Sequence, residues 1–158
     1  MRPTRDPAHH RPVPSDVEAI SALIMSYAER LDAGDLDGVA VLFAHATWRS
    51  PARAEPLRGA AAVRRAYDGV LLYDGIPCTR HMVTNLVVEL EGPDRAAARS
   101  CFTVFQARPD FALQPIISGR YHDAFERVGG AWRFADRLIL PDLVGDLSRH
   151  LRGPGPGR

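Results

Sequence analysis

The chain of 158 residues contains no lysine, and all 20 of its Lys or Arg positions are arginine. A Schiff base with a carbonyl substrate requires a lysine amine, so this class of covalent mechanism is excluded. Acidic side chains number 19, which leaves a formal net charge of only +1. No segment concentrates positive charge between aromatic residues as nucleic-acid-binding surfaces do, so we expect no nucleic-acid partner.

Cysteine and long apolar runs are also scarce. Cys78 and Cys101 are the only cysteines, without a CxxC, which supports neither a zinc ribbon nor a disulfide scaffold and favours two free thiols. No run approaches the ~18 apolar residues of a membrane span, and residues 1–14 lack the apolar segment of a signal peptide. We therefore expect a cytoplasmic protein without a membrane partner.

The remaining composition indicates one globular domain. With 46% hydrophobic residues the chain can form one substantial core, and it is too short for two. Residues 1–14 hold four prolines and are predicted to be a flexible arm, and residues 152–158, rich in glycine and proline, a flexible tail. The folded domain is predicted to span residues 15–151.

The segment 15–34 predicts an amphipathic helix with marked ends. Ser15 and Glu18 fit a capping box, apolar residues recur at helical spacing, and Gly34 ends the helix. Tyr27 lies in the apolar stripe. Asp32, five residues further on, is rotated by about 140° from Tyr27 around the helix axis and borders the stripe. These two residues are either capped core residues or a catalytic pair.

Two more helices and a short strand complete the first half. Residues 35–43 predict a short helix capped by Asp35, and residues 60–73 a third helix, ended by Gly75 and Pro77. Between them, the β-prone residues 46–50 predict a first strand. Its Trp48 is either a core anchor or the wall of a pocket.

The second half has the period of strands, at residues 79–91, 95–109, 116–128 and 131–140. Pairing the last two about Gly129 and Gly130 puts Asp123 opposite Asp136 on an apolar face, and turns His122 and Arg137 outward unless a bulge shifts the register. Three helices followed by such a sheet predict an α+β domain, a cone of helices and curved sheet that leaves a cavity.

Oligomer formation is a further prediction. The strand from Thr79 to Leu90 is largely apolar on both faces. One face would be covered by the helices and the other by a neighbouring subunit. We expect a homodimer or a homotrimer.

Several runs together resemble a known family: YAERLDAGD, LFA, GAAAVR, TRHMVTNLVVEL and GRYHDAFERVGGAWRFADR. They are similar to the SnoaL-like polyketide cyclase and dehydratase branch of the nuclear transport factor two superfamily, over roughly Asp16 to Leu140. The resemblance implies a cone-shaped α+β barrel, with three N-terminal helices on a curved antiparallel or mixed sheet. The superfamily includes cyclases, dehydratases, isomerases and non-catalytic binding domains.

The resemblance also implies site residues. In its dehydratases a tyrosine and an aspartate of the first helix face a histidine at the start of the long strand, and the matching residues are Tyr27, Asp32 and His81. Trp48 stands where the scytalone enzyme has a second pocket tyrosine. The SnoaL cyclases use an acid on a strand as the base, which makes Asp123 and Asp136 candidates.

These residues suit general acid–base catalysis without a cofactor. Asp32 would hold one tautomer of His81, whose other nitrogen takes or returns a proton, and Tyr27 would stabilise a developing oxyanion. The alternative is that His81 is a satisfied core histidine. His81 lacks HxE or HxH spacing, so we expect no metal site.

A hydrophobic small molecule would fill the cone. Asn85, on the predicted face of His81, is either a substrate donor or a buried amide. The remaining predicted lining residues are aromatic: Trp48, Tyr67, Phe102, Tyr121 and Trp132.

The sequence thus predicts a cofactor-free dehydratase, isomerase or cyclase for a polyketide-like or polycyclic carbonyl compound of secondary metabolism. One alternative is a non-catalytic binding module or small subunit with the same fold. Another is a cyclase that acts mainly by holding its substrate in a reactive shape. The enzyme requires Asp32 and His81 within hydrogen-bond reach at a cavity, whereas the module could have that cavity filled by aromatic side chains.

Overall fold

The computed structural model describes residues 14–153. The predicted flexible arm and tail lie almost wholly outside these residues. The elements, in chain order, are α1 (Asp16–Asp32), α2 (Leu36–Leu42), β1 (Thr47–Arg49), β2 (Leu57–Arg58), α3 (Ala60–Ala66), β3 (Thr79–Leu90), β4 (Arg95–Arg108), β5 (Phe111–Val128) and β6 (Ala131–Val144).

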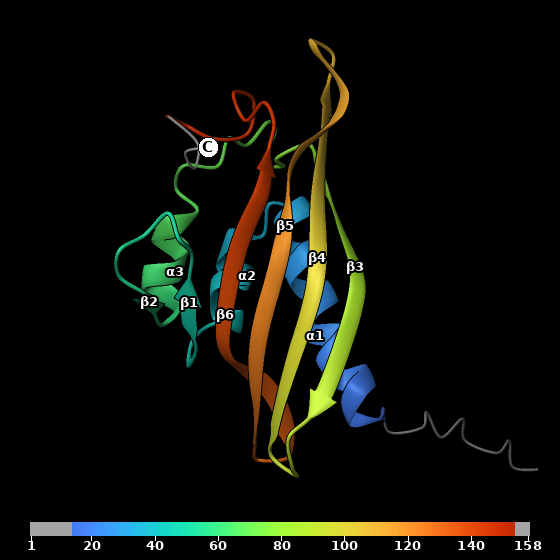
Figure 1. Ribbon diagram of the computed structural model, residues 1–158. Coiled ribbons are helices and arrows are strands. Elements are labelled where there is room, and N and C mark those ends of the chain that lie inside the picture. The colour runs from blue at the N-terminus through green and yellow to red at the C-terminus, as the bar shows by residue number, and fades with distance from the viewer. Residues whose placement is uncertain (1–13, 154–158) are drawn as a thin grey trace, which may run out of the picture.

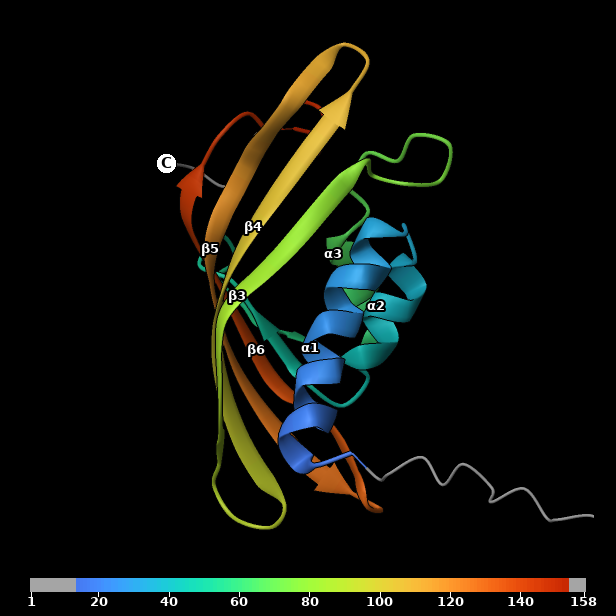
Figure 2. The same cartoon turned by 90° about the vertical axis from the view of Figure 1, so that its right-hand side faces the viewer.

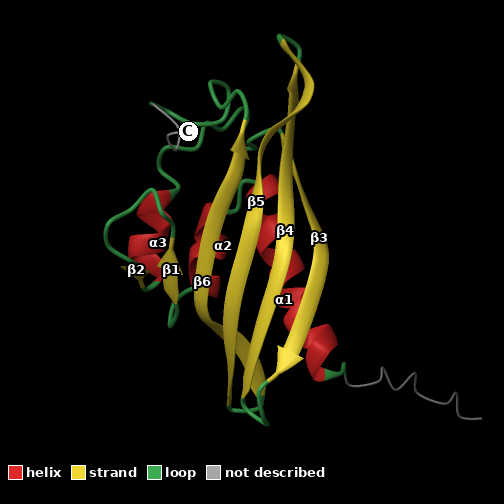
Figure 3. Cartoon of the chain, in the orientation of Figure 1, coloured by secondary structure: helices red, strands yellow, loops and turns green. Residues whose placement is uncertain are grey.

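The strands form one open, mixed sheet in the order β2-β1-β6-β5-β4-β3. Strand β1 runs parallel to β6, and all other neighbours are antiparallel. The sheet curves around the helices, and α1, α2 and α3 all lie on its concave side (Figures 1 and 2). Figure 3 shows the three helices and the short strands β1 and β2, which in the chain lie between α2 and α3 and precede the four long strands. The predicted α+β class, with three helices packed on a curved mixed sheet, is confirmed.

Helix α1 has the predicted ends. The Ser15 hydroxyl accepts from the amide of Glu18, whose carboxylate accepts from the amide of Ser15. Gly34 follows with φ of 75°, and a Cβ there would collide with the carbonyl of Gly75. Within residues 14–153, no helix combines the length and apolar character needed to cross a bilayer.

The core is aromatic and lies between α1, α2 and the inner face of the sheet. Phe43 of α2's C-terminus packs on Phe134 of β6 with ring centroids 4.9 Å apart, and Phe134 packs on Phe125 of β5 at 4.8 Å. Phe102 of β4 stacks on Tyr121 of β5 at 4.4 Å. This packing holds α1 against the middle of the sheet, and with it the side chains of its C-terminal half.

The third helix is shorter than predicted, ending at Ala66 instead of residue 73. The chain beyond it hydrogen-bonds to the C-terminal segment instead: Val70 bridges to Leu151, and the amide of Leu71 donates to the carbonyl of His150. Conversely, β5 begins at Phe111, inside the predicted loop, because it extends the hairpin with β4. Strand β6 likewise continues to Val144.

The predicted register of the last hairpin is wrong beyond its first four pairs. Phe125 pairs with Phe134 as expected, but Ala124 then pairs with Asp136, so Ala135 forms a bulge. Asp123 consequently lies opposite Arg137, not opposite Asp136. Because side chains alternate with a period of two, one extra residue exchanges the inner and outer faces of β6 from Asp136 to the next register shift, between Pro141 and Leu143.

A close approach at Gly119 of β5 provides a stability test. A Cβ at this position would meet the carbonyl of Leu140 and, at 2.9 Å, the ring of Phe102. We expect Gly119→Ala to lower the free energy of unfolding by about 1–3 kcal/mol, since the overpacked neighbours must shift. Urea denaturation measures the change. Gly69→Ala is the control, because nothing lies within 4 Å of its added Cβ; equal effects of the two substitutions would contradict the packing argument.

Candidate functional site

A cavity of about 200 Å³ lies between the C-terminal half of α1, α3 and the inner face of the sheet. Most of its wall is apolar, with a few tyrosine, histidine, threonine and tryptophan side chains. It is lined by Tyr27, Leu31, Leu36, Trp48, Ala66, Tyr67, Val70, Pro77, Thr79, His81, Ile117, Ile139, His150 and Leu151. An apolar cavity with few polar groups is the usual form of a small-molecule site.

The structure brings Asp32 and His81 together at this cavity. Asp32 is the last residue of α1 and His81 the third of β3, so the contact forms where the end of the helix crosses the start of the strand. Nδ1 of His81 lies 2.6 Å from Oδ1 of Asp32, and the amide of His81 donates to Oδ2 at 2.8 Å. Both side chains are more than 90% buried. The nitrogen that Asp32 leaves unoccupied is Nε2.

Asp32 is held as a carboxylate. Burial alone would raise its pKa, but hydrogen bonds and charge from His81 and the hydroxyl of Thr79, 2.9 Å away, outweigh burial and lower the pKa below its usual value. An ionised carboxylate only accepts hydrogen bonds, so Nδ1 of His81 carries the shared proton. The pair therefore presents an imidazole whose Nε2 can accept a proton from a bound molecule.

Two tyrosines provide hydrogen-bond donors at the cavity, whereas Nε2 of His81 is an acceptor. The hydroxyls of Tyr27 in α1 and Tyr67, after α3, lie 2.9 Å apart, and both residues line the cavity. Burial raises the pKa of Tyr27 and raises that of Tyr67 well above its usual value. Both phenols are therefore protonated at neutral pH. Since one hydroxyl donates to the other, one proton of the pair remains available to a ligand oxygen.

A buried ion pair stands directly behind Tyr27. Arg137 of β6 is fully buried and donates to both carboxylate oxygens of Asp123, at 2.8 and 2.7 Å. Its Cζ lies 4.2 Å from the ring centroid of Tyr27 and 4.3 Å from that of Tyr121. Arg137 thus packs on the ring of Tyr27, and Asp123 is paired with Arg137 in the core and does not line this cavity.

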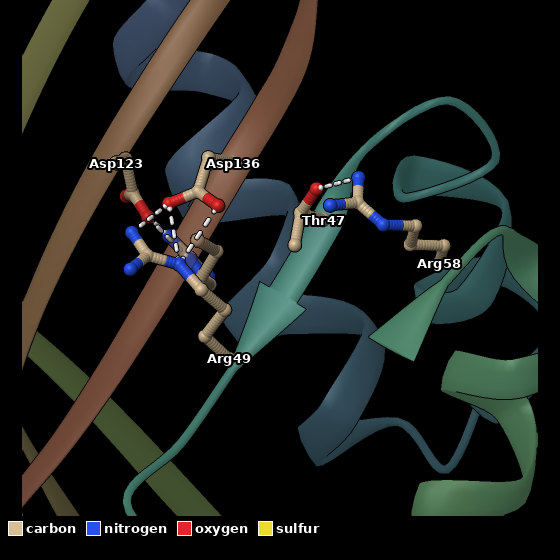
Figure 4. Close-up of polar contacts among 6 residues, drawn as sticks. Thr47, Arg49, Arg58, Asp123 and Asp136 are labelled. Carbon is tan, nitrogen blue, oxygen red and sulfur yellow. Dashed lines mark hydrogen bonds and ion pairs between the residues drawn. The ribbon is translucent and has the colours of Figure 1, made fainter. Parts of the chain in front are cut away.

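The other predicted site residues do not line this cavity. Asn85 lies in a bulge of β3 with φ of 52° and is exposed, so it does not share the inward face of His81. Asp136 faces outward and binds Arg49 of β1 (Figure 4). Trp132 packs near the start of α1, where its indole donates to Asp16. Phe102 and Tyr121 belong to the core behind Tyr27.

Sequence reasoning missed two polar residues of the cavity, Thr79 and His150. Thr79 could have been found from the strand period, because it precedes His81 by two residues and shares its face. His150 lies almost 70 residues beyond His81 in a segment without periodicity. No signal in the sequence places it in the cavity.

Two other hollows have charged residues that are already paired. The larger, about 540 Å³, is lined by residues 115–118 and 141–145, and its one ionisable residue, Asp142, is already paired with Arg120. The other, about 220 Å³, is lined by residues of β3, β4 and β5, among which Glu89 is paired with Arg99 and Asp123 with Arg137, and it also includes His122. Among residues 14–153, no three His, Cys, Asp or Glu side chains are arranged to hold a metal ion.

A family model and several solved structures match this chain. The model of the SnoaL-like domain matches residues 14–138. Rv3472 of Mycobacterium tuberculosis, a protein of unknown function, is 27% identical over 80% of this chain and 72% of its own, with a TM-score of 0.67. An NTF2-like protein with a cystatin-like fold from Novosphingobium aromaticivorans is 24% identical over 80% of this chain and 81% of its own, with a TM-score of 0.67.

A third solved structure bears a functional name. The putative scytalone dehydratase of Novosphingobium aromaticivorans is 20% identical over 90% of this chain and 94% of its own, with a TM-score of 0.67. At this identity the likeness shows the fold alone. Any argument about function therefore depends on the residues of the cavity and not on this likeness.

Proposed function

Because this chain belongs to the SnoaL-like family, we propose that it is a cofactor-independent acid–base enzyme that removes water from a small cyclic hydroxy-carbonyl compound. The hydrogen bond between Asp32 and His81 at the cavity carries the proposal. Such a hydrogen bond alone would also suit a core histidine, but His81 in addition lines a cavity, which favours a catalytic role. The predicted isomerase and cyclase reactions begin with the same proton transfer.

The proposed step moves one proton and breaks one carbon–oxygen bond. Nε2 of His81 takes the proton from the carbon next to the carbonyl, and Asp32 stabilises the imidazolium that forms. The released electron pair forms a carbon–carbon double bond as the hydroxyl on the next carbon departs. His81 then returns the proton to that hydroxyl, so the products are an unsaturated carbonyl compound and water.

The tyrosine pair would stabilise the intermediate charge. As the proton leaves carbon, negative charge gathers on the carbonyl oxygen of the substrate. A hydroxyl proton of Tyr27 or Tyr67 can donate to this oxygen. Because both phenols are protonated and buried, they donate hydrogen bonds without taking part in the proton transfer itself.

The volume of the cavity narrows the class of substrate. Sites for drug-sized ligands enclose about 300–1,000 Å³, and this cavity, at about 200 Å³, is smaller. We therefore propose a compound of one or two rings in place of the larger polycyclic compounds that the sequence left open. Trp48 and Ile139 would pack against its ring faces.

A direct test uses 3-hydroxy-1-tetralone, a two-ring β-hydroxy ketone. Loss of water converts it to 1-naphthol, which is followed by its fluorescence. We expect the wild-type protein to accelerate this reaction by about 10²- to 10⁴-fold over buffer, the usual contribution of positioned proton transfer. If the ketone binds but reacts no faster than in buffer, the chain is a binding protein and the proposal fails.

A further inference from the structure

The segment that follows β6 brings a second imidazole to the cavity. His150 lines the cavity that also contains His81. Its backbone is fixed on both sides, because its carbonyl accepts from the amide of Leu71 at 2.8 Å and its amide donates to the carbonyl of Leu147 at 2.9 Å. Figure 1 shows this C-terminal segment beside the chain between α3 and β3. His150 therefore occupies a defined place in the wall.

A buried side chain of β4 secures the same segment. Gln106, only 1% exposed, donates from Nε2 to the carbonyls of Pro77 and Arg149, at 3.0 and 2.8 Å. The hydroxyl of Tyr73 also donates to the carbonyl of Arg149, at 2.9 Å. The residue before His150 is thus held by two side chains from different parts of the chain.

Two polar atoms of the cavity residues have unused hydrogen-bonding capacity. Nδ1 of His150 and Nε1 of Trp48 are buried and make no hydrogen bond to any residue within 14–153. Both residues line the cavity. Buried polar side-chain atoms in proteins nearly always have a partner. Two such atoms in residues of one cavity wall favour a ligand whose polar groups complete these hydrogen bonds.

The chemistry of His150 indicates the kind of group. Burial, together with the charge of His81, lowers the pKa of His150 to about 4. Its ring is therefore neutral at pH 7 and offers one donor and one acceptor. A hydroxyl group also donates and accepts one hydrogen bond, whereas a carboxylate or an ammonium group matches a neutral imidazole less well.

We infer that His150 binds a hydroxyl group of the substrate in addition to the carbonyl group near which His81 acts. This inference rests on the proposed function, because it assigns a second oxygen to the same substrate. His150 is then a residue that determines substrate specificity. The site then prefers two-ring compounds with a second hydroxyl over those with one oxygen.

Binding of stable phenols tests this preference without any reaction. The probes are 1-naphthol and two diols, 1,3- and 1,6-dihydroxynaphthalene, which carry the second hydroxyl on the same or on the other ring. The additional hydrogen bond from the second hydroxyl to His150 should make wild type bind at least one diol about 2- to 10-fold more tightly than 1-naphthol. Calorimetry measures these affinities. We expect His150→Phe to remove this difference between the diol and 1-naphthol, whatever its effect on the affinity for either compound alone. His122→Phe, at an exposed histidine, is the matched control.

A second measurement needs no substitution. The ring nitrogens of His150 in the wild-type protein should change their ¹⁵N chemical shifts with the preferred diol and much less with 1-naphthol. His150→Gln, which retains a hydrogen-bonding side chain, should keep part of the preference, and thermal unfolding shows whether each variant is folded. The inference is overturned if wild type prefers neither diol or if a folded His150→Phe variant keeps the full preference.

The outcomes separate this inference from the proposed function. Dehydration of 3-hydroxy-1-tetralone by wild type, together with a diol preference that does not depend on His150, would reject the role of His150 alone. A preference that depends on His150, without any dehydration, would reject the catalytic proposal and retain the binding residue. If wild type binds none of the three phenols, the inference is rejected together with the substrate class.

Discussion

Replacing His81 by alanine is expected to lower kcat/KM for 3-hydroxy-1-tetralone by about 10²- to 10⁴-fold, because the base of the proposed proton transfer is lost. The loss should fall mainly on kcat, since an apolar ring packs on the other cavity residues before and after the substitution. Initial rates over a range of substrate concentrations separate the two constants. Full turnover by a folded His81→Ala variant would instead show that His81 is structural and would support an enzyme that acts by holding its substrate in a reactive shape.

Asp32→Asn tests the other half of the pair. An amide retains an oxygen that can accept from the amide of His81, but its NH₂ group no longer stabilises an imidazolium. Because the two residues act as one unit, the double variant Asp32→Asn with His81→Ala should be no slower than the slower single variant. Multiplicative losses would mean that Asp32 acts independently of His81. His122→Ala is the control and should keep wild-type activity.

Asp123→Ala is expected to lower the free energy of unfolding by about 3–5 kcal/mol, because it leaves Arg137 buried without its counter-ion. The guanidinium has no access to solvent, and its charge is stabilised by Asp123: burial opposes the charged form, but the carboxylate outweighs burial and raises the pKa of Arg137 above its usual value. Its Nη1 has no hydrogen-bond partner among residues 14–153 and depends on the surrounding rings. Urea denaturation measures the loss.

A double substitution separates the lost charge pair from lost packing. Asp123→Leu with Arg137→Met removes both charges at similar volume and should recover most of the stability, since apolar residues often replace a buried ion pair without loss. Arg99→Ala breaks an exposed pair with Glu89, in which each side chain is 62% exposed, and should change stability by at most about 1 kcal/mol. A loss below about 1 kcal/mol in Asp123→Ala would show that Arg137 gains no stabilisation from Asp123.

The same ion pair connects stability with the site. Arg137 packs on the ring of Tyr27, whose hydroxyl is bonded to Tyr67 at the cavity. The double substitution of Asp123 and Arg137 therefore changes the support of Tyr27 without touching the cavity itself. Its activity, compared with its recovered stability, reports how much the tyrosine pair depends on this support.

Local patterns were enough for most of the fold. The capping box at Ser15 and Glu18, the glycine at residue 34 and the strand period after Thr79 depend on neighbouring residues, so they can be read directly from the sequence. The positions of Asp32 and His81 followed from a family resemblance, and the structure brings the two side chains to 2.6 Å.

The sequence by itself determined most of the helices and strands, because hydrophobic periodicity and turn residues act over a few positions, but not the end of α3 or the start of β5. Tertiary structure decided which face several side chains occupy. One extra residue at Ala135 turns Arg137 inward to Asp123, and the bulge at Asn85 turns that side chain away from the cavity. Tertiary packing also brought His150 to the cavity, through hydrogen bonds with Leu71 and, beside it, Gln106. Bulges and contacts between distant segments depend on packing over the whole molecule, which local patterns do not encode.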